Sequence, residues 1–415
     1  MSEVFGPGAI RPLGPGFRVL HLSAGHDTGG QGYRLAVASR RHAEWDARAV
    51  RSSPNYINYP SDLIWDKRTI GAVYAAADLI HVHNLTSPLV HLDRDHRKPI
   101  VIHHHGTRFR THWRDILPEQ RRYGFVPLVS TIDLLLCDEY AEWLPSPFNL
   151  AELAALRRKE FRSGGTFRIA HAPTNREVKG TAVFLRAIER LARRHRIEVD
   201  VIEHAPWDEC LRRKAAADLF YDQCDLGYGN NAIECWAMGI PVIAGASDPA
   251  ILARMRAIIG PDLPFIETDE AAMEATLDAA ITDAELRREY ARRGRSYVTR
   301  FHDEPRVVDR LRGIYARALE SRTPHRIVPR GSRGMGTRSL LVRVQIRPGM
   351  WVKLTPEQAR AYQPPPPPEP DPEPAPEPVP APVADVVKPP RRRRAKAVEG
   401  EVKPPRTRRR KVAAA

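Results

Sequence analysis

Residues 217–245, ADLFYDQCDLGYGNNAIECWAMGIPVIAG, decide the fold that we predict for this chain. The segment opens with a short apolar strand at 219–221 and closes with another at 241–244. Between them lies the turn Gly227-Tyr228-Gly229, followed by a predicted helix that carries Glu234. This order suits an anion or a sugar, because glycine lets the backbone approach a ligand and the free N–H groups of a helix start favour negative charge. An ordinary βαβ packing unit with a solvated Glu234 explains the pattern equally well.

A second strand, glycine loop and helix lie near the N-terminus. FRVLHLS at 17–23 is typical of a buried strand, 24–32 is glycine-rich, and a helix is predicted from Tyr33. The loop matches neither GxGxxG nor the Walker pattern, which argues against a dinucleotide or ATP. Further strands are predicted, separated by helices, at 79–83, 100–103, 167–171 and 197–203. This alternation predicts an α/β fold with parallel sheets and right-handed crossovers.

The glycine turn, Glu234 and the run AMGIPVIA at 237–244 resemble the donor-site signature of retaining GT-B-fold glycosyltransferases, the glycosyl transferases group 1 family. The resemblance covers about residues 17–320. It implies two Rossmann-like domains facing across a cleft, a UDP-, GDP- or similar nucleotide-sugar donor, and no metal or other cofactor. The chain departs from the family at Leu226, where a second Glu usually holds the transferred sugar. Asp222 and Asp225 are nearby substitutes.

The same resemblance implies a role for each donor-site residue. The glycine-aromatic-glycine turn, Gly227 to Gly229, leads into the helix whose Glu234 would contact the ribose. HAPTNREVKGT at 171–181 resembles a variant of the family's Arg…Lys-Gly motif, so Arg176 and Lys179 are predicted to contact the pyrophosphate. A planar guanidinium and a mobile ammonium both suit a diphosphate.

The resemblance also points to two places in the first half of the chain. Gly29-Gly30 matches the loop that approaches the donor phosphates and the acceptor, although a tight turn without a ligand would look the same. His105, in a His-Gly-Thr turn after the strand at 100–103, matches a position that faces the interdomain cleft. His105 and Glu234 are therefore our candidate catalytic residues.

Residues 103–105 are three consecutive histidines, which suggests a metal site. On a strand, His103 and His105 share one face and His104 points to the other. No carboxylate follows at ligand spacing, so we predict no metal there. Asp93-Arg94-Asp95 resembles the DxD metal motif of the other glycosyltransferase fold class, but it precedes a strand instead of ending one. We interpret it as a solvated loop.

The basic residues of the chain are concentrated at its C-terminal end. Residues 321–415 contain 21 Lys and Arg against 8 Asp and Glu, which is +13 of the total +15 and leaves +2 for residues 1–320. The basic clusters within 388–411 suit a polyanion such as nucleic acid or an acidic surface, and solubility alone explains them as well. No aromatic residues are interleaved, so nucleic-acid binding would be sequence-blind and salt-sensitive.

These changes in composition predict the organisation of the chain. The predicted segments are a flexible 1–16, an acceptor-side domain at 17–150, a linker at 151–165, a nucleotide-sugar-binding domain with a returning helix at 166–320, a hairpin and helix module at 321–363, and a disordered Pro/Glu linker with a basic tail at 364–415. The hairpin is indicated by alternating apolar residues before and after Pro348-Gly349.

Two alternatives to an active transferase stay open. A catalytically idle GT-B scaffold used for binding is suggested by Leu226, and a nucleic-acid-tethered sugar transferase acting on modified DNA is suggested by the basic tail. The four cysteines are scattered, which indicates reduced thiols and neither a zinc site nor a disulfide framework. No apolar run reaches the ~18 residues of a membrane helix, so we expect a soluble, cytoplasmic protein.

Overall fold

The computed structural model describes residues 12–23, 25, 27–53, 57–84, 98–157, 165–320, 342–347 and 350–354. The chain forms two units, Met1–Ile327 and Val328–Ala415, which we describe separately. In the second unit, β14 (Val342–Arg347) and β15 (Met350–Leu354) pair antiparallel, at the place of the predicted hairpin. Residues 1–11, the Asp93–Asp95 stretch, 158–164 of the predicted linker and the predicted tail at 364–415 lie outside the described residues.

The first sheet is parallel throughout its described strands and has the order β3-β2-β1-β4-β5-β6-β7. The central strands are apolar and buried along most of their length, as expected for a sheet covered on both faces. Its strands are β1 (Arg18–Ser23), β2 (Asp46–Arg51), β3 (Leu63–Ile64), β4 (Leu79–His83), β5 (Ile100–His104), β6 (Val126–Val129) and β7 (Glu142–Trp143), with helices α1 (Gln31–Ala43), α2 (Lys67–Ala76) and α4 (Thr107–Tyr123).

The second sheet has a parallel core of β9, β8, β10, β12 and β13, to which β11 adds antiparallel on β12. Its strands are β8 (Phe167–His171), β9 (Ile197–Val201), β10 (Leu219–Gln223), β11 (Leu226–Gly227), β12 (Val242–Ala246) and β13 (Ile266–Glu267). The helices are α6 (Thr181–Leu191), α7 (Trp207–Ala215), α8 (Asn230–Ala237), α9 (Pro249–Ile259) and α10 (Met273–Thr282).

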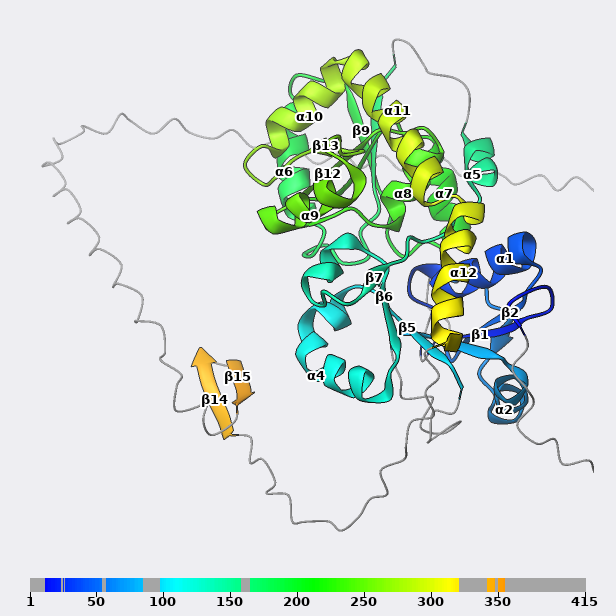
Figure 1. Ribbon diagram of the computed structural model, residues 1–415. Coiled ribbons are helices and arrows are strands. Elements are labelled where there is room, and N and C mark those ends of the chain that lie inside the picture. The colour runs from blue at the N-terminus through cyan, green and yellow to red at the C-terminus, as the bar shows by residue number, and fades with distance from the viewer. Residues whose placement is uncertain are drawn as a thin grey trace, which may run out of the picture. The chain divides into compact units, whose positions relative to one another are not determined.

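Two long helices then run from the second sheet back to the first (Figure 1). α11 (Ala284–Phe301) packs with the second sheet, where Tyr297 and Val298 join its core. α12 (Glu304–Glu320) packs instead on the first sheet and on α1, through an apolar stripe that includes Leu311 and Tyr315. A returning helix was predicted at the end of residues 166–320, and α12 lies at that place in the chain. The predicted α/β fold with two parallel-sheet domains is confirmed.

Some elements were not predicted. β2 (DARAVR) alternates charged with small apolar residues, and its charges hide the strand pattern. α4 contains Pro118 and is mostly polar, with three buried residues, so it has little of the apolar content that marks a core helix. The short α5 (Leu150–Leu156) occupies the first part of the predicted linker and is capped by Asn149, whose side chain accepts the Glu152 N–H. None of the helices in the described part of the chain is both long and apolar enough to cross a bilayer.

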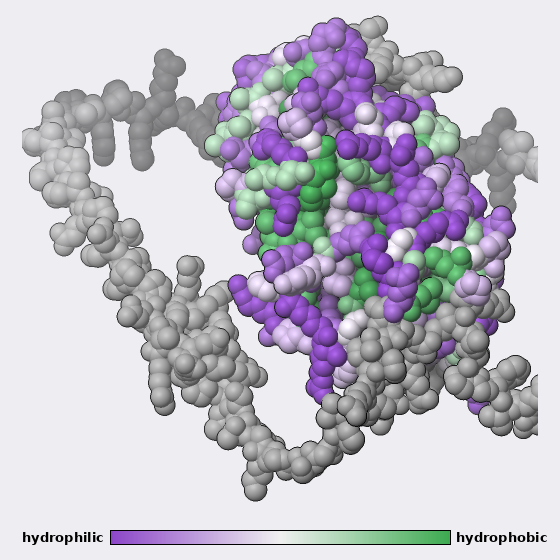
Figure 2. Space-filling model, in the orientation of Figure 1, coloured by the Kyte–Doolittle hydropathy of each residue, from purple (hydrophilic) through white to green (hydrophobic). Residues whose placement is uncertain are grey.

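The face in Figure 2 is mostly hydrophilic, with apolar patches near its middle.

Several histidines are buried in the interior. His171 uses both ring nitrogens, Nδ1 at 3.0 Å from the Tyr221 carbonyl oxygen and Nε2 at 2.8 Å from the Thr181 hydroxyl. His302 donates from Nδ1 to the Ser146 carbonyl at 2.9 Å. Burial lowers the pKa of each to about 4, so both are neutral at pH 7.

Acidification should therefore destabilise the protein. Between the unfolded pKa near 6.5 and the folded pKa of about 4, the unfolded state binds more protons, so stability falls as the pH drops. One such histidine removes about 1.3 kcal/mol between pH 7.5 and 5.5. We expect His302→Gln to reduce the pH dependence of the urea-unfolding free energy by that amount. His112→Gln, which changes an exposed histidine of α4, is the control. An unchanged pH dependence in His302→Gln would contradict this account.

Candidate functional site

A pocket of about 480 Å³ opens at the carboxyl ends of β8 and β9. This edge of a doubly wound sheet is where such folds bind ligands, because the loops that follow the strands converge there. Gly29 reaches the pocket from the first sheet, and Lys179, Asn230 and Asn231 supply polar groups. The lining residues are Gly29, Ile57, Tyr59, Ala172, Pro173, Thr174, Lys179, Ile202, His204, Ala205, Trp207, Cys210, Asn230 and Asn231.

Lys179 lies beside the start of α8. Its ammonium donates to Asp222 at 2.9 Å, and the other Asp222 oxygen accepts the Gly229 N–H at 2.5 Å. A Cβ added to Gly229 would lie 3.4 Å from the Lys179 nitrogen, so the cation and the helix start converge on one point. An ammonium and a helix N-terminus are both anion-binding groups. In this structure the anion that they hold is the Asp222 carboxylate.

Arg176 does not line the pocket, although it lies on the same loop as Lys179. Its side chain is 58% exposed and forms a two-point ion pair with Glu203, which follows β9. The pair raises the pKa of Arg176 and lowers that of Glu203. The structure therefore brings one of the two predicted pyrophosphate cations to the pocket and holds the other at the surface.

Glu234 lies beneath the pocket and is 1% exposed. One carboxylate oxygen accepts hydrogen bonds from Trp207 Nε1 at 2.8 Å and from Arg34 at 3.1 Å. The other is in contact with the ammonium of Lys214, whose side chain is completely buried. The Glu234 carboxylate, for which the resemblance implied a contact with the ribose, is thus surrounded by three donors of the protein itself.

The surroundings of this pair favour the charged form of both members. Burial works against the charged forms, but the Lys214 and Arg34 cations outweigh it and lower the pKa of Glu234. Burial likewise opposes the charge on Lys214, and the Glu234 carboxylate overcomes it and raises its pKa. Glu234 and Lys214 form a buried ion pair at pH 7.

Two residues of the glycine turn serve packing. Tyr228 is buried in the second core, where its hydroxyl bonds that of Tyr297 and its ring packs edge-on against Trp236. Gly227 has φ 81°, and a Cβ there would lie 2.1 Å from the terminal methyl of Met255 on α9. Neither lines the pocket. Of the predicted turn, Gly229 is the member that lies beside the Lys179 ammonium.

The predicted loop Gly29-Gly30 is left-handed at both residues, with φ 64° and 66°. A Cβ on Gly29 would lie 2.5 Å from the Asn230 side chain, and one on Gly30 would lie 2.8 Å from the Tyr59 ring. The Gly29 carbonyl accepts hydrogen bonds from Asn230 and from Arg34. The loop therefore contacts the start of α8 directly, which explains why both positions suit glycine.

His105 is turned away from this pocket. It is 5% exposed, its Nε2 lies 2.9 Å from His83 Nδ1, and its backbone N–H donates to the Asn84 side chain at 2.6 Å. Gly106 follows it at φ 67° and begins α4. The structure places His105 in a buried group of histidines and does not bring it to Glu234 or Lys179.

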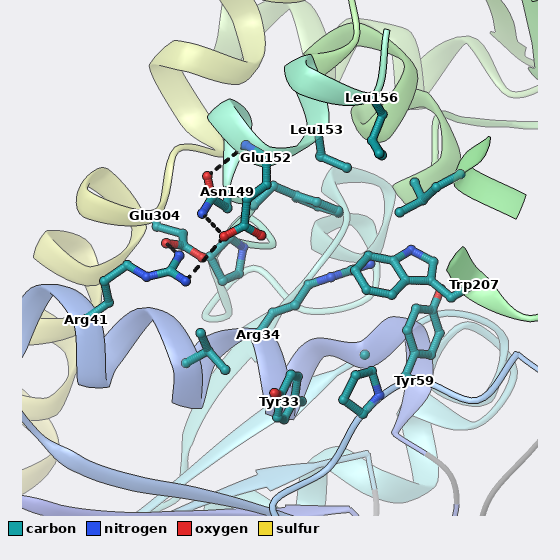
Figure 3. Close-up of a pocket in the computed structure, with 16 residues that line it drawn as sticks. Tyr33, Arg34, Arg41, Tyr59, Asn149, Glu152, Leu153, Leu156, Trp207 and Glu304 are labelled. Carbon is teal, nitrogen blue, oxygen red and sulfur yellow. Dashed lines mark hydrogen bonds and ion pairs between the residues drawn. The ribbon is translucent and has the colours of Figure 1, made fainter. Parts of the chain in front are cut away.

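A second pocket, of about 420 Å³, lies beyond Arg34 and shares Tyr59 and Trp207 with the first. Figure 3 shows the Arg34 side chain extending towards the Trp207 indole. The guanidinium carbon lies 4.2 Å from the centre of the Phe148 ring and 5.2 Å from those of Tyr59 and Trp207. Because Arg34 also bonds Glu234, it joins the two sheets and separates the two pockets.

A network of charged groups closes the far end of this second pocket. Arg41 contacts Glu304 of α12 at 2.6 Å and Glu152 of α5 at 3.5 Å, as the dashed lines in Figure 3 show. The Asn149 amide also donates to Glu152 at 2.5 Å. These contacts hold α1, α5 and α12 together around an apolar cavity.

Sequence reasoning missed Arg34, Trp207 and Lys214. One signal was available for Lys214. It shares the buried stripe of α7 with Leu211 and Ala215, and a lysine in an apolar stripe needs a buried anion. Arg34 had no such signal, because its partner Glu234 is 200 residues away in the sequence.

No family model and no curated protein matches this chain. Solved structures do match it in fold. An alpha-glucosyltransferase in complex with UDP and a 13-mer DNA containing an HMU base is 11% identical, with TM-score 0.56 over 73% of this chain and 100% of that one. Anabaena HepE, in complex with UDP and glucose, is 15% identical, with TM-score 0.51 over 74% and 100%. A glycosyltransferase from Rickettsia africae is 11% identical, with TM-score 0.53 over 74% and 99%. At these identities the likeness establishes the shared GT-B fold.

Proposed function

We propose that the protein is a glycosyltransferase that moves a sugar from a nucleotide-diphosphate sugar to an acceptor. The observation that carries the proposal is the pocket at the carboxyl edge of the second sheet. There Lys179 and the N-terminus of α8 meet the Gly29 loop of the first sheet. A fold shared with proteins that bind UDP supports the same ligand class.

In this proposal the donor diphosphate takes the place of the Asp222 carboxylate at Lys179 and the Gly229 N–H. Lys179 would then neutralise charge on the leaving diphosphate as the sugar–phosphate bond breaks. Positioning and electrostatic stabilisation account for most of the rate in such a site. A metal-independent, hexosyl-transferring reaction with retention at the anomeric carbon is part of the proposal. An NMR assignment of the product anomer would test retention.

The buried ion pair changes the roles proposed for the catalytic candidates. Glu234 acts as a positioning residue, because its carboxylate holds Trp207 and Arg34 against the pocket. A direct ribose contact would require one of these donors to move aside. His105 has no contact with the pocket lining in this arrangement, so we assign it no part in transfer. Lys179, which lines the pocket, is the main binding group.

The test is a thermal-shift series on the full-length protein with UDP, GDP, ADP and their sugar forms, followed by assay for donor hydrolysis. A ligand that binds the folded state raises the melting temperature by mass action. We expect one nucleoside diphosphate to stand out, with a shift of a few degrees at about 100 times its Kd. If the nucleotide raises the melting temperature of Lys179→Ala as much as that of the wild type, it binds away from Lys179. If none of these nucleotides changes the melting temperature, the proposal is overturned.

A catalytically idle scaffold is the second candidate, and two observations favour it. Leu226 stands where related transferases carry a sugar-holding Glu, and here it is half-buried in β11. The Lys179 ammonium already has Asp222 as its partner. Nucleotide binding without hydrolysis or transfer would support this candidate. Transfer to modified DNA stays a further alternative, and the basic clusters within 388–411 that suggested it lie outside the described residues.

A further inference from the structure

Five histidines lie together on one face of the first sheet. β1, β4 and β5 are neighbours in the order of the sheet, and alternate residues of a strand share a face. The register pairs His21 with His81 and His83 with His103, and His105 is two residues beyond His103. The histidines of this face therefore come from three strands that are separated in the sequence.

The five imidazoles are in mutual contact. The rings of His81 and His83 are stacked with centroids 4.7 Å apart, and those of His103 and His105 lie 4.4 Å apart. Nδ1 of His83 lies 2.9 Å from Nε2 of His105, while Nε2 of His83 lies 3.3 Å from Nδ1 of His21. Two sets of three, His21-His81-His83 and His83-His103-His105, each bring one nitrogen per residue within 4.8 Å of the others.

The cluster is buried, with exposures of 0% to 5%. Within the described residues, several of its ring nitrogens nevertheless make no hydrogen bond. Both nitrogens of His103 and Nδ1 of His105 are unpaired, as are Nε2 of His21 and Nε2 of His81. Buried polar atoms normally have partners, so this many in one place indicates a ligand that the imidazoles share.

We propose that His83, His103 and His105 bind one divalent transition-metal ion, with zinc as the preferred metal. Three histidines are a known ligand set for zinc, and imidazole nitrogens bind it at about 2.0–2.1 Å. Nitrogens around one such ion lie a little over 3 Å apart, and one nitrogen from each residue of this set lies within 4.8 Å of the others. Small side-chain movements would therefore close the set around an ion. The expectation of no metal considered only residues 103–105, and β4 supplies the third ligand.

This set is favoured over the alternative because of its outer contacts. His81 of the other set donates or accepts at Nδ1 with the Tyr315 hydroxyl, 2.8 Å away, which orients that ring towards α12. His21 then orients His83 through the latter's second nitrogen, as outer-shell partners of metal-bound histidines do. The His103 ring, for which no hydrogen-bond partner is found in the described part of the chain, contacts the rings of both His83 and His105.

The surroundings suit a structural ion. A Cβ on Gly32 would lie 3.3 Å from His83 Nε2 and 3.4 Å from both oxygens of Asp27, so a buried carboxylate is close to the cluster. Asp27 caps α1 through the Gly32 and Tyr33 N–H groups. The ion would join β4 and β5 beneath the loop that carries Gly29.

The test measures metal in the full-length protein, purified without a histidine tag. Elemental analysis should find about one zinc per chain, and a strong chelator should lower the melting temperature. Cobalt(II) added to the chelated protein should give visible absorption bands of the intensity typical of four-coordinate cobalt, a readout independent of enzyme activity. No stoichiometric metal after zinc is supplied, together with no cobalt bands, would overturn the proposal.

Variants separate this site from casual binding. His103→Gln and His105→Gln should each abolish stoichiometric zinc and the cobalt bands. His104→Gln is the matched control, since His104 is equally buried on the same strand but points to the opposite face, at 3.0 Å from Gln120. If all three variants contain the same amount of metal, the protein binds an adventitious ion only and the proposal is overturned. Should His103→Gln fail to fold, the cobalt titration of the wild type still decides the matter.

Discussion

We expect Glu234→Ala to lower the free energy of unfolding by about 3–5 kcal/mol, because it leaves the fully buried Lys214 ammonium without its counter-charge. The Asn231 side chain would still accept from that ammonium, at 3.0 Å, but it carries no charge. Arg34 and the Trp207 indole would lose an acceptor at the same time. Against a typical stability of about 5–15 kcal/mol, such a loss would leave little margin. Urea unfolding at pH 7.5 measures it.

The double variant Lys214→Met/Glu234→Leu separates charge from packing. Replacing both members of a buried pair by apolar residues of similar volume is often neutral, so the double variant should recover most of the lost stability. Glu285→Ala is the control, because Glu285 also pairs with an arginine but is exposed, and little change is expected. A Glu234→Ala protein as stable as the wild type would refute the buried pair. A loss of activity in this variant cannot by itself identify a ribose contact.

Local patterns predicted what depends on neighbours in the sequence. The apolar strands, the helix α12 and the loops after strands follow from residue order, and Lys179 and Gly29, both named on the resemblance, line one pocket. The partners of Glu234 could not be found in this way. Lys214 is 20 residues from it and Arg34 is 200 residues away, so only the docked sheets bring the three together.

The glycine turn shows a second limit of pattern. Gly-Tyr-Gly is compatible both with a ligand and with tight packing, and the sequence does not tell which residue does which. Gly227 lets Met255 approach and Tyr228 fills the core, while Gly229 faces the Lys179 cation. Likewise the alternation of His81 with His83 was visible in the sequence. Its meaning needed the strand order β1-β4-β5, which no local signal gives.

The largest effect on activity is expected from Lys179→Ala. If the leaving diphosphate binds at this ammonium, its loss should lower kcat by about 10²–10³-fold, the usual cost of removing one preorganised charge-stabilising donor. The stability cost should be smaller than that of Glu234→Ala, because Lys179 is 13% exposed and Asp222 keeps its bond from the Gly229 N–H. Arg176→Ala, at a surface ion pair, should have the weaker effect on kcat.

A double variant distinguishes two roles of Lys179, which are binding the diphosphate and neutralising Asp222. Lys179 could matter only because it neutralises Asp222, in which case Lys179→Ala/Asp222→Asn, with neither charge, would regain activity. If Lys179 instead binds the departing diphosphate, the double variant stays as slow as Lys179→Ala although its unfolding free energy recovers. Asp222→Asn alone should then bind the nucleotide at least as tightly as the wild type, since the ammonium and the start of α8 lose the anion that competes for them. Weaker nucleotide binding in Asp222→Asn would instead make the carboxylate part of the donor site and would overturn the exchange proposed for Lys179.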